Sequence, residues 1–339
     1  YCTGDSSDFI TSIFNTLKTQ LPGIIQRITE KQRRDSLPEL SGSYPIADQQ
    51  RLSRDLMESF GFDFNRGRID VSAHPFSTGC RGDQRITTRF RESEFIEALL
   101  ATAHETGHAS YESGLPKEWD GLPIGQARNM CIHESQSLLF EKQVFLSRPF
   151  ISFFISRIHE HLVSTERLNE NDLWSAATKV QPSYIRVEAD EVTYPLHVIL
   201  RYEIESGLIN GELEADDIPE LWDTKMIKYL GLSTAGNFSD GCLQDIHWTD
   251  GSFGYFPSYT IGALNSAQLF FAIKRSFPDW QDRLANGDIA FVRNWLTTAV
   301  WSKGSSMDSQ VIIEGATGKK TGADSFLKHI KERYLEDDI

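Results

Sequence analysis

Three residues in one short segment could carry out metal-assisted hydrolysis. His104, Glu105 and His108 form an H-E-x-x-H motif in the 339-residue sequence. On a helix, residues i and i+4 lie one turn apart on one face, so both imidazoles can bind one metal ion. Glu105 points about 100° away round the helix and can reach a water molecule on that metal. Gly107 costs a helix about 1 kcal/mol relative to alanine, which indicates that another segment approaches closely.

A catalytic zinc site needs a third protein ligand and one open position. The sequence offers Glu134, which follows His108 by 26 residues, and the adjacent His133. Both lie in a second segment with helical spacing, after a turn rich in proline and glycine. Adjacent helical residues point about 100° apart, so only one of the two can face the metal. With Glu134 as ligand, two antiparallel helices would share the ion.

Amide hydrolysis follows from such a ligand set. Zn²⁺ held by two imidazoles and a carboxylate lowers the pKa of its bound water to near 7. Glu105 would accept the proton of this water and return it to the leaving amine. Co²⁺ or Mn²⁺ could occupy the same ligands, since metal availability often decides. The alternative is a helix with two histidines that are solvated or packed and bind no metal.

Helices must position most of these residues. Apolar residues recur every three or four positions over residues 92–113, which predicts the helix that carries the motif. The same spacing over residues 9–17 predicts another helix, and Pro22-Gly23 interrupts its pattern. Residues 68–90 alternate between apolar and polar types, which predicts two short strands joined by a glycine-rich turn at residues 78–82. We therefore expect a mainly α fold with a small β-sheet beside the active site.

Composition narrows the set of partners. The 34 Lys+Arg and 48 Asp+Glu leave a formal charge of −14, which disfavours nucleic acid because phosphate binding needs a basic surface. No stretch approaches the roughly 20 apolar residues of a membrane span, so we expect no membrane partner. The sequence carries no charged-then-apolar leader, and we expect a cytoplasmic protein.

The sequence resembles the carboxypeptidase Taq family of metallocarboxypeptidases. The family's conserved blocks appear here in order as His74-Pro75-Phe76, Asp83 to Thr87, His104 to His108, His133 to Gln136, Ile185 to Asp190, and Gly241 to Trp248. The resemblance covers the C-terminal two thirds of family members, and their N-terminal helical region has no counterpart in this sequence.

The resemblance implies a zincin-like helical metallopeptidase, with one catalytic domain over residues 1–339. It implies His104, His108 and Glu134 as zinc ligands and Glu105 as general base. It also implies removal of C-terminal residues from peptides, with broad specificity, by a homodimer.

An exopeptidase of this type needs a cation for the free carboxylate of its substrate. Arg186 is the first candidate, since a guanidinium can hold a carboxylate in two places. Arg85 is the second candidate. The alternative roles are ion pairs, of Arg186 with Glu188 or Asp190, and of Arg85 with Asp83.

Four further residues are candidates for substrate contacts. His247 and Tyr259 could donate hydrogen bonds to the oxyanion or to the substrate backbone. His74 could form part of a pocket wall, and Asp245 could orient His247. The alternative for His247 is a satisfied core histidine, and for Tyr259 a packed aromatic residue.

Two other functions use the same residues. An aminopeptidase or endopeptidase would share the metal chemistry, and an aminopeptidase would need carboxylates such as Glu188, Asp190 or Glu191 to hold the substrate's α-ammonium group. The chain could also be an inactive remnant that binds metal or peptide without cleaving it.

Overall fold

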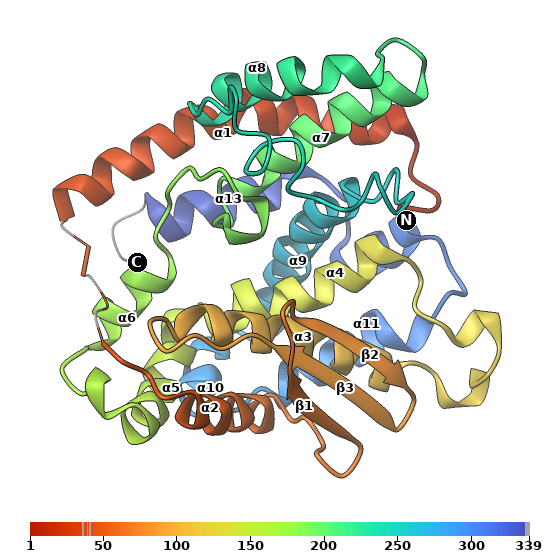
Figure 1. Cartoon of the computed structure of the whole chain (residues 1–339). Coiled ribbons are helices and arrows are strands. Elements are labelled where there is room, and N and C mark those ends of the chain that lie inside the picture. The colour runs from red at the N-terminus through yellow and green to blue at the C-terminus, as the bar shows by residue number, and fades with distance from the viewer. Residues whose placement is uncertain (36, 39, 41, 336–339) are drawn as a thin grey trace. The chain divides into compact units, whose positions relative to one another are not determined.

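The computed structural model describes residues 1–35, 37–38, 40 and 42–335. This part of the chain is mainly helical, with thirteen α-helices and one three-stranded sheet (Figure 1). The expected fold class is confirmed. Among the described helices none is long and apolar enough to cross a membrane.

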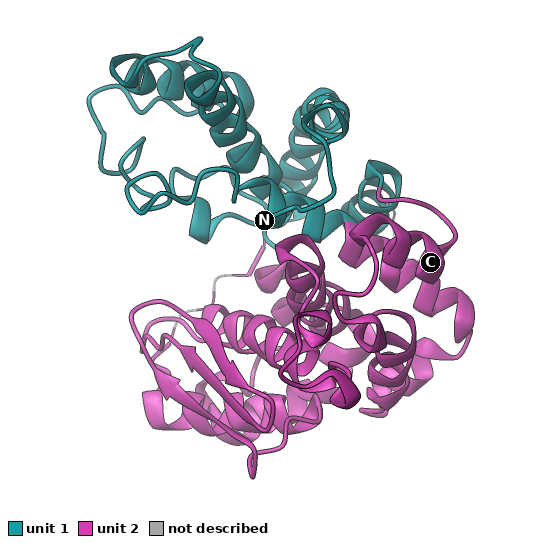
Figure 2. Cartoon of the chain, turned by 90° about the vertical axis from the view of Figure 1, so that its right-hand side faces the viewer, with its two compact units in different colours: residues 1–36, 179–264, 322–339 teal, residues 37–178, 265–321 magenta. Residues whose placement is uncertain are grey.

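The chain divides into two compact units, which Figure 2 colours separately. Unit 1 comprises residues 1–36, 179–264 and 322–339, and unit 2 comprises residues 37–178 and 265–321. The H-E-x-x-H motif belongs to unit 2, and the candidates Arg186, Asp245, His247 and Tyr259 belong to unit 1.

Unit 1 is built from helices α1 (Ser7–Asp35), α7 (Tyr194–Ile209), α8 (Ile218–Leu230) and α13 (Ala323–Tyr334), with the first residues of α9 (Pro257–Ser276). α1 packs against α7, α8 and α13.

Helix α1 continues through Pro22, so the predicted interruption at this residue is wrong. A proline inside a helix removes one hydrogen bond and costs about 3 kcal/mol or more. Leu21 and Ile28, on either side of the break point, are buried and belong to one apolar face. Packing of this face against the rest of unit 1 offsets the local cost.

Unit 2 contains α2 (Ile46–Ser59), α3 (Ile96–Gly114), α4 (Met130–Leu138), α5 (Arg148–His161), α6 (Glu170–Ala177), α10 (Trp280–Ala285), α11 (Ala290–Ala299) and α12 (Ser309–Thr317), with the remainder of α9. A π-helical segment, Leu139–Phe145, follows α4 directly. The core of this unit is rich in fully buried aromatic side chains, which include Phe60, Phe95, Tyr111, Phe140, Phe150 and Trp301.

The sheet of unit 2 has the order β1-β3-β2, with β1 (Gly67–Val71) parallel and β2 (Phe76–Cys80) antiparallel to β3 (Asp83–Thr88). The two predicted strands are confirmed as β1 and β3, but the single glycine-rich turn predicted between them is wrong, since most of it belongs to strand β2. The actual turn lies at Gly82, whose φ of 83° suits a residue without a Cβ. Ladder pairing with β3 outweighs the poor strand propensity of this segment.

The sheet packs against the helix that carries the motif. Ile86 of β3 is fully buried in a small apolar cluster with Ala109 of α3 and Met57 of α2. Strands β2 and β3 both contact α3. The sheet therefore lies against the helix that carries the motif.

Candidate metal centre and polar cluster

Helices α3 and α4 approach each other closely at Gly107. A Cβ atom added there would lie 2.6 Å from Ser137 Cα and 2.7 Å from the carbonyl oxygen of Gln136. Only glycine permits this approach, which agrees with the expectation for Gly107. Trp301 Nε1 donates to Gln136 Oε1 at 2.8 Å, so a buried hydrogen bond holds α4 in place at this level.

This packing brings three metal-binding side chains together. The Nε2 atoms of His104 and His108 lie 3.8 Å and 3.5 Å from Glu134 Oε2. The ligand atoms of the three residues all lie within 4.8 Å of one another. Two donors bound tetrahedrally to zinc at about 2.0–2.1 Å are roughly 3.3 Å apart. The donor set and its spacing therefore fit a zinc-type cation.

His133, the alternative third ligand, takes a different position. Its Nδ1 lies 2.6 Å from His108 Nδ1, and its Nε2 lies 2.8 Å from Glu112 Oε1. Both nitrogens of the ring are thus engaged by neighbouring side chains, whereas the carboxylate of Glu134 faces the Nε2 atoms of the two motif histidines.

Glu141 is a residue at this centre that the sequence analysis missed. Its Oε2 lies 2.9 Å from His104 Nδ1, and its Oε1 pairs with Lys142 Nζ at 2.5 Å. Glu141 belongs to the π-helical segment after α4, a geometry that often occurs at functional sites. It follows Glu134 by seven residues, but the π-helical segment begins between them, so α-helical spacing does not indicate it.

Burial and neighbouring charges shift the pKa values of the two motif histidines in opposite directions. Burial alone would lower the pKa of His104, but the carboxylates of Glu134 and Glu141 outweigh it and raise the pKa to about 9. Burial lowers the pKa of His108 to about 4, although Glu134 acts in the opposite direction. Below pH 9 the metal-free protein therefore holds a proton on both ring nitrogens of His104, and a bound cation must displace the proton on the ligating nitrogen.

Glu105 is buried close to these groups. Burial raises its pKa to about 7, and the carboxylates of Glu134 and Glu141 act in the same direction against His104. A carboxylate with a pKa near 7 can both accept and release a proton at neutral pH, as a general base and acid must.

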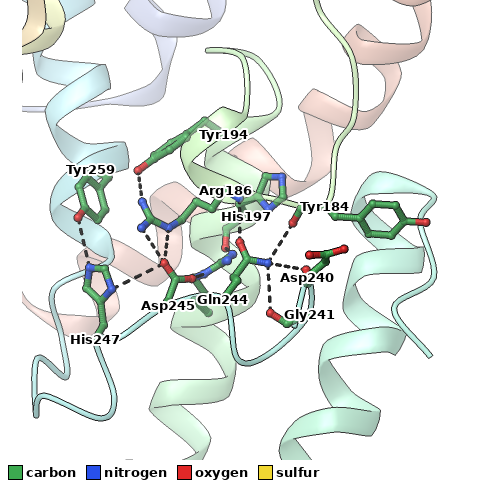
Figure 3. A network of polar contacts seen from close by, with 11 residues as sticks. Tyr184, Arg186, Tyr194, His197, Asp240, Gly241, Gln244, Asp245, His247 and Tyr259 are labelled. Carbon is green, nitrogen blue, oxygen red and sulfur yellow. Dashed lines mark hydrogen bonds and ion pairs between the residues drawn. The ribbon is translucent and has the colours of Figure 1, made fainter. Parts of the chain in front are cut away.

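A second polar cluster lies in unit 1 around Arg186 (Figure 3). Arg186 Nη2 and Nε donate to Asp245 Oδ1 at 2.7 Å and 3.0 Å, and its Nη1 donates to the hydroxyl of Tyr194 at 2.7 Å. Asp245 therefore pairs with Arg186, where the sequence analysis considered Glu188 and Asp190. Asp190 instead accepts hydrogen bonds from the backbone of Val192 and Thr193.

Arg201 of α7 is a second residue that the sequence analysis missed. Its Nε donates to Asp245 Oδ2 at 2.6 Å, and its side chain is fully buried. Burial lowers the pKa of Arg201 only to about 10, so both guanidiniums are charged at neutral pH. Asp245 balances one of the two charges. The sequence could have indicated Arg201, because it is a charged residue within the apolar run of α7.

Gln244 and His247 hold the loop that carries Asp245. Gln244 Nε2 donates to the carbonyl oxygens of Asp240 and Gly241, and its Oε1 accepts from the backbone N–H of Arg186 at 2.8 Å. His247 Nε2 lies 3.2 Å from the hydroxyl of Tyr259, while its Nδ1 is 3.8 Å from Asp245. Asp245 therefore holds two arginines more closely than it holds His247.

The structure gives Arg85 and His74 other surroundings. Arg85 is exposed on β3 and pairs with Asp83 at 2.9 Å, which is the alternative considered for it. His74 is exposed in the connection between β1 and β2, and its carbonyl oxygen accepts from Thr87 Oγ1 at 3.3 Å.

Two histidines of an H-E-x-x-H helix that meet a carboxylate from the next helix define a metallopeptidase-type centre. The chain belongs to the carboxypeptidase Taq (M32) metallopeptidase family, whose model matches residues 1–334.

Two relatives and one solved structure illustrate the similarity. Thermostable carboxypeptidase 1 of Thermus thermophilus is 39% identical over 95% of this chain, and carboxypeptidase 1 of Bacillus subtilis is 35% identical over 96%. The structure of metallocarboxypeptidase 1 of Trypanosoma cruzi is 38% identical, with a TM-score of 0.96 over 99% of this chain and 71% of that one. The chain spans 63% and 65% of the lengths of the first two relatives.

Proposed function

We propose that this chain is a metallocarboxypeptidase that hydrolyses the C-terminal peptide bond of peptides. The observation that carries the proposal is the approach of His104, His108 and Glu134 within 4.8 Å of one another, with Glu105 buried nearby. Membership of a metallopeptidase family supports it. Two imidazoles and one carboxylate form a donor set of catalytic zinc sites, so zinc is the proposed metal.

Glu105 and Glu134 have different roles in the proposed reaction. When bound, zinc supplies Lewis-acid chemistry that polarises the scissile carbonyl and acidifies water. Glu105 accepts a proton from the attacking water and returns it to the leaving amine, for which a pKa near 7 is suitable. Glu134 supplies negative charge that helps hold a divalent cation.

Arg186 is proposed to bind the free carboxylate of the substrate. Arg186 and Arg201 carry two positive charges and share the single carboxylate of Asp245, which leaves a surplus charge of +1 in a buried cluster. A carboxylate ligand would neutralise this surplus with charge-assisted hydrogen bonds. His247 and Tyr259 are proposed to donate to the substrate.

Peptides with blocked ends test this function. An N-blocked dipeptide with a free carboxylate should be cleaved, and its C-amidated counterpart should be cleaved at least about 100-fold more slowly, because the charged contact with Arg186 is lost. The measurement is kcat/KM for the two peptides with the zinc-loaded chain.

Other outcomes would point to the alternatives. Faster cleavage of amidated peptides with a free N-terminus would favour an aminopeptidase. Cleavage of the doubly blocked peptide as fast as its free acid would favour an endopeptidase. Cleavage of none of these peptides would favour an inactive binding protein. The expected homodimer and cytoplasmic location stay predictions.

A further inference from the structure

Each motif histidine uses its outer nitrogen for a hydrogen bond to a partner that is not a proposed metal ligand. In both rings Nε2 faces Glu134, at 3.8 Å from His104 and 3.5 Å from His108. The outer nitrogen is therefore Nδ1 in both. His104 Nδ1 meets a carboxylate directly, at Glu141, whereas His108 Nδ1 meets a second imidazole, at His133.

The contact between the two imidazoles has one consistent proton arrangement when both rings are neutral. His133 Nε2 lies 2.8 Å from Glu112 Oε1, and a carboxylate only accepts, so Nε2 carries the proton of His133. His133 Nδ1 is then an acceptor, and at 2.6 Å it accepts from His108 Nδ1–H. The lone pair of His108 is left on Nε2, the atom that faces Glu134.

Glu112 and His133 lie on α3 and α4, the two helices that carry the proposed metal ligands. Glu112 follows His108 by four residues, which is one further turn of the same helix face of α3. His133 precedes Glu134 on α4 and packs its ring against those of His108 and Tyr111, with centroids 4.6 Å and 5.2 Å away. The two helices that supply the proposed ligands thus also supply the groups that orient one of them.

We propose that His133 and Glu112 are positioning residues of the metal centre, which fix the tautomer and ring orientation of His108 through the chain Glu112–His133–His108. This inference rests on the proposed metal ligation. Outer partners of a ligand histidine change metal affinity by about 10- to 100-fold when removed.

Zinc affinity of the full chain, measured by competition with a chromophoric chelator, tests the proposal without an activity assay. His133→Phe keeps a ring of similar size and removes the acceptor, and we expect it to weaken zinc binding about 10- to 100-fold. His133→Asn places an amide oxygen near the position of Nδ1 and should recover most of the affinity. Glu112→Ala changes a half-exposed side chain and should weaken binding about 10-fold.

A matched control is available in the same unit. His161 Nε2 pairs with Asp55 Oδ2 at 2.9 Å, and its side chain is 15% exposed, against 16% for His133. His161→Phe makes the same substitution in a similar histidine–carboxylate contact outside the metal centre, and we expect unchanged zinc affinity.

Different outcomes would overturn the positioning role and the metal centre. Zinc affinity of His133→Phe and Glu112→Ala within twofold of the unmodified chain would overturn the positioning role, as would equal losses in His133→Phe and His161→Phe. Failure of His133→Asn to bind better than His133→Phe would also overturn it. Failure of the unmodified chain to bind zinc would instead overturn the proposed metal centre. In Co²⁺-loaded protein, the visible absorption bands of His133→Phe should shift while those of His161→Phe stay unchanged.

Discussion

Replacement of Glu105 by glutamine is expected to lower kcat on an N-blocked dipeptide by about 10³-fold, because the amide cannot accept the proton of the attacking water. Zinc affinity should stay within about threefold, since Glu105 is not one of the three residues whose ligand atoms converge. The measurements are steady-state kinetics and chelator competition on the same preparation.

Glu97→Gln is the control for this substitution. Glu97 lies on the same helix, α3, but its side chain is 41% exposed and pairs with Arg91 at 3.2 Å. This variant should turn over like the unmodified chain. Equal turnover by Glu105→Gln and Glu97→Gln would contradict the role of Glu105 as base.

Replacement of Arg186 by methionine is expected to lower kcat/KM on peptides with a free C-terminus by about 100-fold, mainly through KM. Loss of a charged hydrogen-bonded contact costs about 3 kcal/mol, which corresponds to this factor. Amidated peptides, which lack the carboxylate, should be cleaved at an unchanged low rate. Asp245 keeps its ion pair with Arg201 in this variant, so the cluster stays paired.

Arg333→Met is the matched control, because Arg333 is also a buried arginine of unit 1 and pairs with Glu191 at 2.6 Å. It should keep the preference for free carboxylates. The ratio of kcat/KM for free and amidated peptides is the measurement. A larger change of this ratio in Arg85→Met than in Arg186→Met would assign the substrate carboxylate to Arg85 instead.

Local spacing was sufficient to predict that His104, His108 and Glu134 come together. An i, i+4 pair of histidines on an amphipathic segment specifies which face they share, and the distance of 26 residues to Glu134 leaves room for one turn and a second helix. The cost of Gly107 in a helix pointed to the close approach of α4. These inferences depend on geometry within one helix or between two neighbouring helices.

Features that depend on long-range packing could not be predicted in this way. The partner of Arg186 lies 59 residues away, and Arg201 meets the same carboxylate from a third segment. Strand β2 forms because its backbone pairs with that of β3, although the residues of β2 are typical of a turn. Glu141 reaches His104 from a π-helical segment, and helical spacing alone does not indicate where a π turn occurs.

The central claim is that one divalent ion is held between α3 and α4. A crystal structure of the zinc-loaded chain, with anomalous diffraction recorded at the zinc edge, tests it most directly. We expect one peak at about 2.0–2.2 Å from His104 Nε2, His108 Nε2 and a carboxylate oxygen of Glu134. A peak bound by His133 in place of Glu134, or a peak remote from both motif histidines, would contradict it.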